Sequence, residues 1–472
     1  MGVKDIFKRV STIMPEVDAP RKRIELRVKL IWTAIVVVIY LIMSEIPLYG
    51  VGRAPTDPFF YSRVIFASSR GTLMELGIGP IVTAGLVLQL LSGAEIIRFD
   101  FTNPEDRALF TAATKFLTII ITFAQSAAYL LAGVFGTGLT ITTISAIFIQ
   151  LVIATLIVMM LDELVQKGWG IGSGISLFIA VGVAQNIFWD TFSPMPVREE
   201  GYDSFYGIIP HLTNLLANGR SMAESVFRSN PQFPSLTGLA ATIAVAIVII
   251  YVEGIRVELP ISYARHRGFR GRYPVKLLYV SNIPVILASA LIQNLYMITQ
   301  MTWSRFNPQN SHWFFNLIAT YNATNMQPTG GLAYYVTSPI GLAQAASEPI
   351  RALAFIGILT LLSVVFANIW VQIGGLSADK VSQQLIDAGM QVPGFRRRTY
   401  SISTVLGKYI PVMTIVGGLF VGLIAGSTQI IGVFGSGIGI LLTIDILMQY
   451  YQLLMREQVE EIYPSISRVL KV

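Results

Sequence analysis

The sequence contains no cysteine and only three histidines among its 472 residues. Without thiolates the chain has no disulfides, and it cannot build the zinc or iron–sulfur sites that depend on them. The three histidines, His211, His266 and His312, are far apart and fit no metal-ligand spacing. We therefore expect neither a metal ion nor a cofactor.

Charged residues are scarce as well. They make up 13% of the chain, against 53% hydrophobic residues, whereas a typical soluble domain carries about 25% charged residues. Within the apolar segments the carboxyl groups that stand out are Glu45 and Asp445. Ion-coupled transporters usually place ionisable groups at the membrane midplane, and a membrane enzyme would need clustered His, Asp or Glu. The scarcity disfavours both classes, so we do not expect an enzyme. Asp445 can equally be a structural residue that is paired with another side chain or a functional one.

Ten stretches are long and apolar enough to cross a membrane, which takes about 20 residues in a helix. They predict an all-α, multi-pass membrane protein whose two ends lie on the same side. The predicted spans are residues 30–49, 76–93, 114–135, 139–161, 171–189, 236–253, 277–299, 352–373, 409–427 and 430–454.

The basic residues predict the orientation, because cytosolic segments of membrane proteins are enriched in Lys and Arg. With the N-terminal segment 1–29 in the cytosol, the cytosolic segments hold 26 of the 34 Lys and Arg residues. These segments include the loops 254–276 and 374–408 and the C-terminal tail 455–472. The excess positive charge favours an acidic partner on the cytosolic side, either lipid head groups or nucleic acid.

The spans divide into a first half, 30–189, and a second half, 236–454, which are joined by the long external loop 190–235. With five spans in each half, the second half crosses the membrane in the opposite sense to the first. An inverted repeat of this kind places a functional site between the halves, near the midplane. This prediction rests on the span count, because the two halves show no clear self-similarity in sequence.

One stretch, Leu76–Gly93, is uncharged yet unlike an ordinary apolar helix. It begins LGIGP, and proline is tolerated in the first turn of a helix but breaks a helix elsewhere. We therefore predict a helix that starts near Pro80, within the membrane. Ile78 and Val82 then lie four residues apart on one face. Because irregular backbone at this depth needs cover from protein or a cavity, the stretch is predicted to line a pore or a binding site.

Two other patterns predict structure rather than chemistry. The alternating glycines after the fourth span do not fit a phosphate-binding GxGxxG loop, and no GK[ST] follows them. The adjacent Asp162 and Glu163 do not face each other on a helix, so we expect them at a solvated helix end. In the ninth span three glycines form a small-xxx-small face for close helix packing; they are Gly418, Gly422 and Gly426.

Two longer motifs carry a resemblance to a known family. GIGPIVTAGLVLQLL (Gly77–Leu91) and LDELVQKGWGIGSGISLFI (Leu161–Ile179) resemble the two family motifs of SecY, the channel subunit of the protein-conducting translocon. The form looks closer to the archaeal and eukaryotic branch. The likeness extends through YPVKLLYVSNIPVIL (Tyr273–Leu287), GFRRR (Gly394–Arg398) and GSGIGILLTIDI (Gly435–Ile446).

The resemblance implies ten transmembrane helices in two inverted halves around a central hourglass pore. It implies a passive channel that passes unfolded secretory polypeptides across the membrane and releases membrane-protein helices sideways into lipid. A ring of apolar side chains would seal the waist, since a narrow apolar ring excludes ions by dewetting. Without the motifs, ordinary core packing would explain the same residues. The ring positions are Ile78, Val82, Ile175, Ile179, Ile286 and Leu442.

The resemblance also implies a plug and a lateral gate. By position, the plug, a short helix in the outer funnel, corresponds to about residues 57–73; the alternative is a re-entrant structural segment. The gate would run between the second and third spans and the seventh and eighth, where hydrogen bonds would close the seam. The plug candidates are Phe60, Ile65, Phe66, Ser68 and Arg70, and the gate candidates are Thr83, Gln125 and Asn282.

Partners follow from the same resemblance. The basic cytosolic loops are implied to contact the ribosome through Arg265, Arg267, Arg396 and Arg397, since arginine binds phosphate bidentately and keeps its charge. Positive-inside bias and lipid contact explain these residues without a ribosome. SecE-type and beta-type small membrane subunits would complete a heterotrimer, and signal peptides and nascent chains would be the substrates.

The expected location is the cell (plasma) membrane, with both termini in the cytosol and the spans in contact with the lipid bilayer. An alternative from a different class is an inverted-repeat secondary transporter. Its signature would be ionisable ligands at the midplane, where the sequence predicts an apolar ring.

Overall fold

A computed structural model of the chain describes residues 14–22, 24–51, 67–93, 96–97, 99, 103–131, 134–136, 139–199, 202–226, 228, 233–263, 270–280, 283–322, 327–339, 341–387, 390–391 and 399–462. Ten helices correspond in order to the ten predicted spans, so the predicted fold class is confirmed. They are α2 (Leu26–Glu45), α4 (Gly79–Gly93), α5 (Pro104–Leu131), α6 (Ile141–Leu164), α7 (Gly174–Phe192), α9 (Leu236–Glu253), α10 (Ile283–Phe306), α14 (Pro349–Ile373), α16 (Thr399–Ile431) and α17 (Gly437–Ile462).

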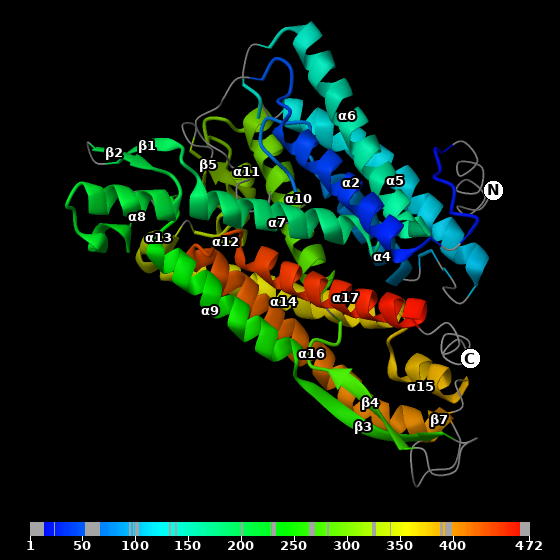
Figure 1. The fold of residues 1–472 in the computed structure, drawn as a ribbon. Coiled ribbons are helices and arrows are strands. Elements are labelled where there is room, and N and C mark those ends of the chain that lie inside the picture. Colours follow the sequence, from blue (N-terminus) through cyan, green and yellow to red (C-terminus); the bar gives the residue numbers. More distant parts are fainter. Residues whose placement is uncertain are drawn as a thin grey trace.

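These helices form two groups of neighbours (Figure 1). In the first, α4 packs on α5, α5 on α6, and α2 and α6 on α7; in the second, α10 packs on α14, α14 on α16, and α16 and α9 on α17. The groups touch along two lines. Helix α7 contacts α17 on one side. On the other side α4 contacts α10 and α14, and α5 contacts α10.

The helix α4 is shorter than the others. Nine helices in the described ranges are long and apolar enough to cross a membrane, whereas α4 has only 15 residues. Fifteen residues rise about 22 Å, less than the roughly 30 Å of a hydrocarbon core. The helix starts at Gly79–Pro80, two residues after Gly77, which has a φ of +52°. The predicted start near Pro80 is confirmed, and a left-handed glycine makes the turn before it.

The ninth and tenth predicted spans need correction at their ends. Residues 430–454 were predicted as one span, but α16 continues to Ile431 and α17 starts only at Gly437. Between them Gly432, Gly435 and Ser436 all have positive φ, which ends the helix. At its other end α16 starts ten residues earlier than the predicted span, because there it packs against soluble elements in a separate apolar cluster around Leu406.

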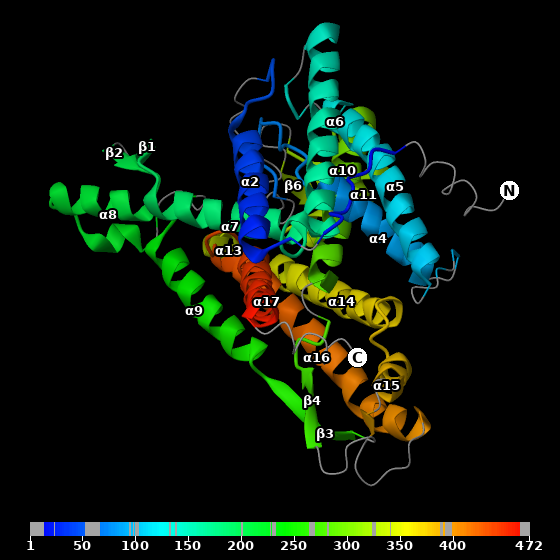
Figure 2. The same cartoon turned by 45° about the vertical axis from the view of Figure 1, so that its right-hand side comes forward.

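Short elements connect the helices, and three small antiparallel sheets among them are absent from the sequence prediction. The sheets are β1–β2, β4–β3–β7 and β5–β6. The β3–β4 hairpin projects at the opposite end of the molecule from α11 (Figures 1 and 2). These elements are β1 (Pro196–Glu199), β2 (Tyr202–Phe205), β3 (Arg256–Tyr263), β4 (Arg270–Lys276), β5 (Thr320–Tyr321), β6 (Pro328–Gly330), β7 (Met390–Gln391), α8 (Ile208–Ala217), α11 (Trp313–Ile318), α12 (Leu332–Val336), α13 (Gly341–Ser347), α15 (Ala378–Asp387), a π-helical turn η1 (Val165–Trp169) and a 3-10 turn η2 (Met222–Ser225).

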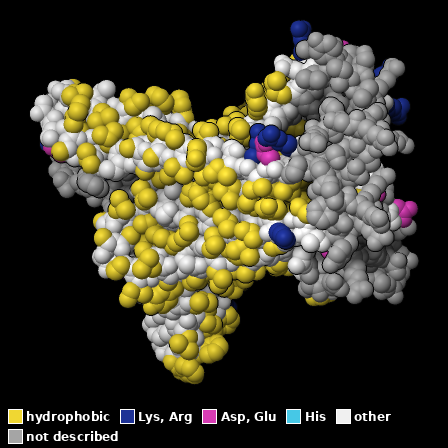
Figure 3. Space-filling view, turned by 90° about the horizontal axis from the view of Figure 1, so that it is seen from below, with side chains coloured by type: hydrophobic (Ala, Val, Ile, Leu, Met, Phe, Trp, Pro, Cys, Tyr) yellow, Lys and Arg dark blue, Asp and Glu magenta, His cyan; other side chains and the backbone are white. Residues whose placement is uncertain are grey.

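The outer surface of the helices is largely apolar (Figure 3). Helix α9 exposes Ile243, Ile247 and Ile250, and α14 exposes Ile350 and Leu353. In water such a surface would be costly, whereas in a bilayer it faces lipid. The exposed aliphatic residues therefore mark the lipid-facing sides of the helices.

The glycine face of α16 packs against α14, as predicted. A Cβ added at Gly422 would lie 2.5 Å from the Thr360 Cα, and one at Gly418 or Gly426 would lie 3.1 Å from a backbone Cα of α14. Because the obstacle is backbone, it cannot move aside like a flexible side chain. The glycines therefore set the distance between the two helices.

We expect Gly422→Ala to destabilise the protein by about 1–3 kcal/mol through overpacking. The matched control is Gly407→Ala in the same helix, where an added Cβ meets nothing within 4 Å. That change should be neutral or stabilise by up to about 1 kcal/mol, because alanine favours helix over glycine. Thermal unfolding in detergent measures both. Equal melting temperatures for the two variants would contradict the close packing.

Candidate functional site

The six predicted waist residues share a position within their helices. Each lies among the first six residues of a helix or, for Ile78, directly before one. Four helices contribute, namely α4, α7, α10 and α17, so the start of each helix determines where its waist residues lie. The contributions are Ile78 and Val82 at α4, Ile175 and Ile179 on α7, Ile286 on α10 and Leu442 on α17.

The start of α7 is fixed by Asp162 at the end of α6. The Asp162 Oδ1 accepts a hydrogen bond of 2.9 Å from the Ile175 backbone N–H. A Cβ at Gly174 would lie 2.5 Å from the Asp162 Cα, so only glycine allows this approach. The carboxylate satisfies one of the free N–H groups at the helix start and favours the positive end of its dipole. It thereby positions Ile175 and, one turn later, Ile179.

The start of α17 is fixed in a similar way. The Ser436 Oγ accepts a hydrogen bond of 3.1 Å from the Gly439 N–H and caps the helix. Before it, Gly435 has a φ of +65°, and a Cβ there would lie 2.9 Å from the Ile187 Cγ1 on α7. The break therefore fits tightly against α7, and Leu442 lies two turns beyond it.

The structure brings all six waist residues into one hydrophobic cluster. Ile78, Val82, Ile179 and Leu442 are buried, while Ile175 and Ile286 are half-buried against the same cluster. Because the cluster is also the main core of the helices, burial alone does not distinguish a pore ring from ordinary packing. The ring therefore stays a prediction.

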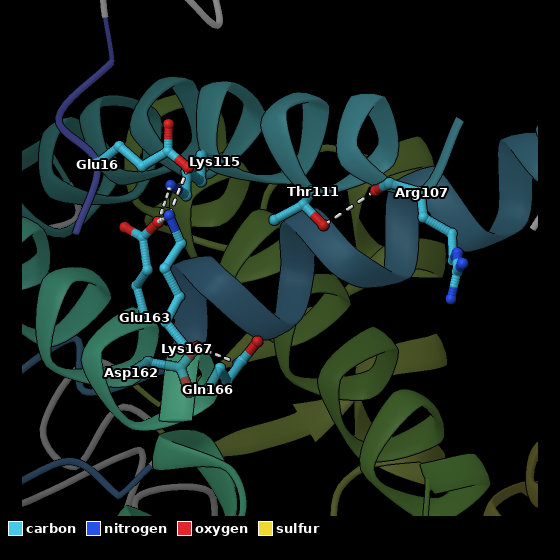
Figure 4. Close-up of polar contacts among 8 residues, drawn as sticks. All are labelled: Glu16, Arg107, Thr111, Lys115, Asp162, Glu163, Gln166 and Lys167. Atoms are coloured by element: carbon cyan, nitrogen blue, oxygen red, sulfur yellow. Dashed lines mark hydrogen bonds and ion pairs between the residues drawn. The ribbon is translucent and has the colours of Figure 1, made fainter. Parts of the chain in front are cut away.

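Asp162 and Glu163 are both buried, so the predicted solvated helix end is wrong. Figure 4 shows why burial is tolerated here. The Glu163 Oε1 lies 2.6 Å from the Lys115 Nζ of α5 and 3.1 Å from the Lys167 Nζ. Lys167 also pairs with Glu16 of the N-terminal segment, and this pairing lowers the Glu16 pKa. The two carboxyl groups thus face different partners, and the ion pairs join α5, α6 and the N-terminal segment.

Polar side chains meet where α4 and α5 contact α10. The Gln125 Nε2 donates to the Asn294 Oδ1 at 3.2 Å, and the Asn294 Nδ2 donates to the Thr83 Oγ1 at 3.1 Å. A third, longer contact of 3.5 Å joins the Gln125 Nε2 to the Thr83 Oγ1. We call these three residues the polar seam.

Two of the seam residues, Thr83 and Gln125, are sequence candidates for the gate, while Asn282 lies outside the described residues. Sequence reasoning missed Asn294, although an asparagine inside an apolar span was a usable signal. Its partner Thr83 lies 211 positions earlier in the chain, and no local sequence pattern indicates this contact.

The structure describes the end of the predicted plug. Phe60, Ile65 and Phe66 lie outside the described residues, whereas Ser68 and Arg70 are half-buried. The Tyr40 hydroxyl of α2 donates to the Ala67 carbonyl oxygen at 3.1 Å. Ser68 also lines a cavity of about 240 Å³ between α2 and α7, whose rim holds Glu45. The described end of the segment, residues 67–70, therefore lies against two spans rather than on the surface.

The four arginines predicted to bind the ribosome lie outside the described residues. In the sequence they follow β3 and β7, and these two strands are paired in the sheet β4–β3–β7. On the described part of the hairpin, the Arg272 Nη1 lies 2.6 Å from the Glu258 Oε2. This contact lowers the Glu258 pKa. The hairpin therefore carries a further exposed arginine.

Asp445 is not isolated. The Gln449 Nε2 donates to its Oδ2 at 2.9 Å, and its carboxyl group neighbours that of Glu253, the last residue of α9. The Lys276 Nζ lies 3.8 Å from the Glu253 Oε2. Asp445 thus belongs to a polar cluster at the level where α9 ends, near the basic hairpin.

Comparisons with known proteins agree with this arrangement. The SecY family model matches residues 72–451, and the model described as the plug domain of Sec61p matches residues 38–71. The protein transport protein Sec61 subunit alpha of Dictyostelium discoideum is 42% identical to this chain over 467 residues, which is 97% of each chain.

Two solved structures are similar over 99% of both chains. One is a protein-conducting channel, with 35% identity and a TM-score of 0.83. The other is Sec61 in the canine ribosome–channel complex from the endoplasmic reticulum, with 35% identity and a TM-score of 0.81.

The polar seam generates a prediction. We expect Asn294→Leu to weaken the contact between α10 and α4–α5 by about 1–3 kcal/mol, because it leaves Gln125 and Thr83 buried with fewer partners. The native chain has no cysteine, so spin labels attach only at the two introduced cysteines, Ile120→Cys on α5 and Ile298→Cys on α10. The measured distance between the two labels then reports the separation of α5 and α10. Both positions are exposed. The distance distribution should broaden toward longer values.

The matched control is Gln293→Leu, which makes the same kind of change one residue earlier on α10. Its distance distribution should stay that of the parent protein. A distribution that is identical in the two leucine variants would show that the seam contributes nothing to holding the helices together.

Proposed function

This chain belongs to the SecY family, and we propose from that premise that its six aliphatic waist residues seal the pore of a protein-conducting channel. The chain is the channel subunit of a protein translocase. Unfolded secretory polypeptides pass through the waist, and apolar helices of membrane proteins leave sideways into lipid. The chain supplies a path and no chemistry, so the driving force comes from a partner.

The observation that carries this proposal is the convergence of four helix starts on one aliphatic cluster. A narrow aliphatic opening cannot replace the hydration shell of an ion, so it blocks ions while closed. Aliphatic side chains also deform around a substrate of any sequence, because they make no directional bonds. A secondary transporter would instead use ionisable ligands to hold its ions, whereas the carboxyl groups nearest the waist, Asp162 and Asp445, accept hydrogen bonds from the Ile175 N–H and the Gln449 side chain.

The polar seam between α4–α5 and α10 is the lateral gate in this proposal. Its bonds are neutral, and such bonds between membrane helices contribute about 1 kcal/mol each or less. The free energy of breaking these bonds is small, and the transfer of an apolar substrate segment into lipid offsets it. The plug, with its end held between α2 and α7, fills the outer side of the closed channel and leaves when a substrate enters.

The partners are the ribosome and two small membrane subunits of the SecE and beta types. The basic loops 254–276 and 374–408 extend from one end of the molecule, where the β4–β3–β7 sheet joins them. Ribosomal RNA is a polyanion, and arginine binds its phosphates bidentately. The canine relative supports this part of the proposal, since its structure is a ribosome–channel complex.

The location follows from the orientation. We place both termini and the basic loops in the cytosol, and the chain in the cell membrane of a cell that has no internal secretory membrane. In a cell with an endoplasmic reticulum, the same orientation toward ribosomes places it there, as for the canine relative. Membrane fractionation distinguishes the two locations.

Cysteine crosslinking tests the pore. Single cysteines are introduced as Ile78→Cys, Ile179→Cys and Leu442→Cys, and one is placed in a stalled secretory chain. We expect disulfides at all three positions, because a chain in transit touches the whole ring. The control Ile247→Cys on the lipid-facing side of α9 should not react. If the three waist positions fail to react with the secretory chain while Arg396→Cys does react, the protein only docks substrates and does not conduct them.

Charge reversal tests the ribosome contact. Arg265→Glu combined with Arg396→Glu should weaken ribosome binding about tenfold or more, because charge-assisted bonds to phosphate are lost and repulsion replaces them. Binding is measured by cosedimentation of the reconstituted protein. Arg305→Glu makes the same change at the other end of α10 and should have no effect. A larger effect of Arg305→Glu would reverse the proposed orientation.

A further inference from the structure

The connection between α10 and α14 is uncharged over an unusual length. From Phe306 to Ser347 the sequence has 42 consecutive residues without Asp, Glu, Lys or Arg. A water-facing loop of this length would typically carry about ten charged residues. The connection lies outside the spans, since it holds the short elements α11, β5, β6, α12 and α13. Its composition is therefore unexpected for a segment exposed only to water.

Apolar side chains of the connection point outward. On α11, Trp313 is 75% exposed and Leu317 is 64% exposed, and Phe314 lies between them, also exposed. On α12, Leu332 and Tyr335 are exposed as well. Large aromatic and aliphatic residues therefore form the outer side of this connection.

Three asparagine side chains of the same connection make hydrogen bonds within the protein. The Asn307 Nδ2 donates to the Asn316 Oδ1 at 2.8 Å, and the Asn316 Nδ2 donates to the Asn310 carbonyl oxygen at 3.0 Å. The Asn310 Oδ1 accepts a bond of 2.7 Å from the buried Trp303 indole of α10. Amides thus hold α11 against α10, which is the reverse of the usual arrangement of a soluble loop.

We propose that this outward apolar surface, on α11 and α12, inserts into the interfacial layer of the external leaflet. Tryptophan and tyrosine are enriched at this depth because their rings are apolar and their polar tips reach water. Helix α11 packs on α10, and α12 packs on both α10 and α14. These two long helices also expose apolar residues, namely Ile298 and Phe306 on α10 and Ile350 and Leu353 on α14. The exposed polar residues of the connection, such as Gln309, are uncharged, so it offers no charged group for electrostatic recognition of a protein partner.

The inference rests on the proposed function, because that function defines which leaflet is external. It also has a consequence for the gate. Helix α10 carries Asn294 of the polar seam, and the amide network ties α11 rigidly to the outer end of α10. Insertion of α11 therefore holds the outer end of this gate helix at a fixed depth in the bilayer.

Fluorescence of a label on α11 tests the proposal. Leu317→Cys is labelled with a dye whose emission depends on polarity, and the full complex is reconstituted into phosphatidylcholine vesicles. We expect blue-shifted emission and quenching by a lipid that carries a nitroxide near its head group. Aqueous iodide should quench the label at Leu317→Cys at least about threefold less than the label at Gln309→Cys, because the membrane interface excludes the anion. Gln309 is an exposed polar residue of the same connection.

A second control separates this inference from the proposed function. Leu353→Cys on α14 should be quenched by lipid nitroxide whether or not α11 inserts. If Leu353→Cys is quenched while Leu317→Cys behaves like Gln309→Cys, the inference is wrong and the membrane arrangement stands. If neither is quenched, both are overturned. A blue shift at Leu317→Cys without lipid quenching would mean that protein covers the surface, which also overturns the inference.

Discussion

Every backbone N–H and C=O at membrane depth must find its partner within the protein, because hydrocarbon offers none. The chain meets this requirement at its interrupted helices with specific side chains. Asp162 accepts the Ile175 N–H and Ser436 accepts the Gly439 N–H. Glycines at positive φ make the turns that lead into α4 and α17. Because the waist residues follow directly after these helix starts, the geometry of the waist depends on how the breaks are satisfied.

The polar contacts between helices differ in kind according to where they lie. Between α5 and α6, which belong to the same half, a buried ion pair joins Lys115 to Glu163. Breaking a buried pair by removing one partner costs several kcal/mol, so these helices stay together. Between the halves, the polar seam uses only amides and a hydroxyl, whose net strength is about 1 kcal/mol each or less. A strong contact therefore lies within one group of helices and weak ones lie between the groups, as the proposed gate requires.

The sequence predicted the features that depend on apolarity and local backbone chemistry. The ten helices, the start of α4 at Gly79–Pro80 and the packing of the glycine face of α16 follow from hydropathy, proline and residue size. It did not predict the features that depend on a distant partner. Glu163 was expected in solvent because its partner Lys115 lies 48 positions earlier, and Asn294 was missed because Thr83 and Gln125 belong to other helices.

Helix α10 differs from its partners across the seam in how it is held. At its cytosolic end the β3–β4 hairpin precedes it, and at its outer end Asn310 and Asn316 bind α11 to it. Helix α4, in contrast, has 15 residues and an irregular turn before it. If the interfacial position of α11 fixes the depth of α10, separating the seam costs less free energy when α4 and α5 move than when α10 moves. For the proposed gate this favours a change of tilt or depth on the α4–α5 side over one on the α10 side.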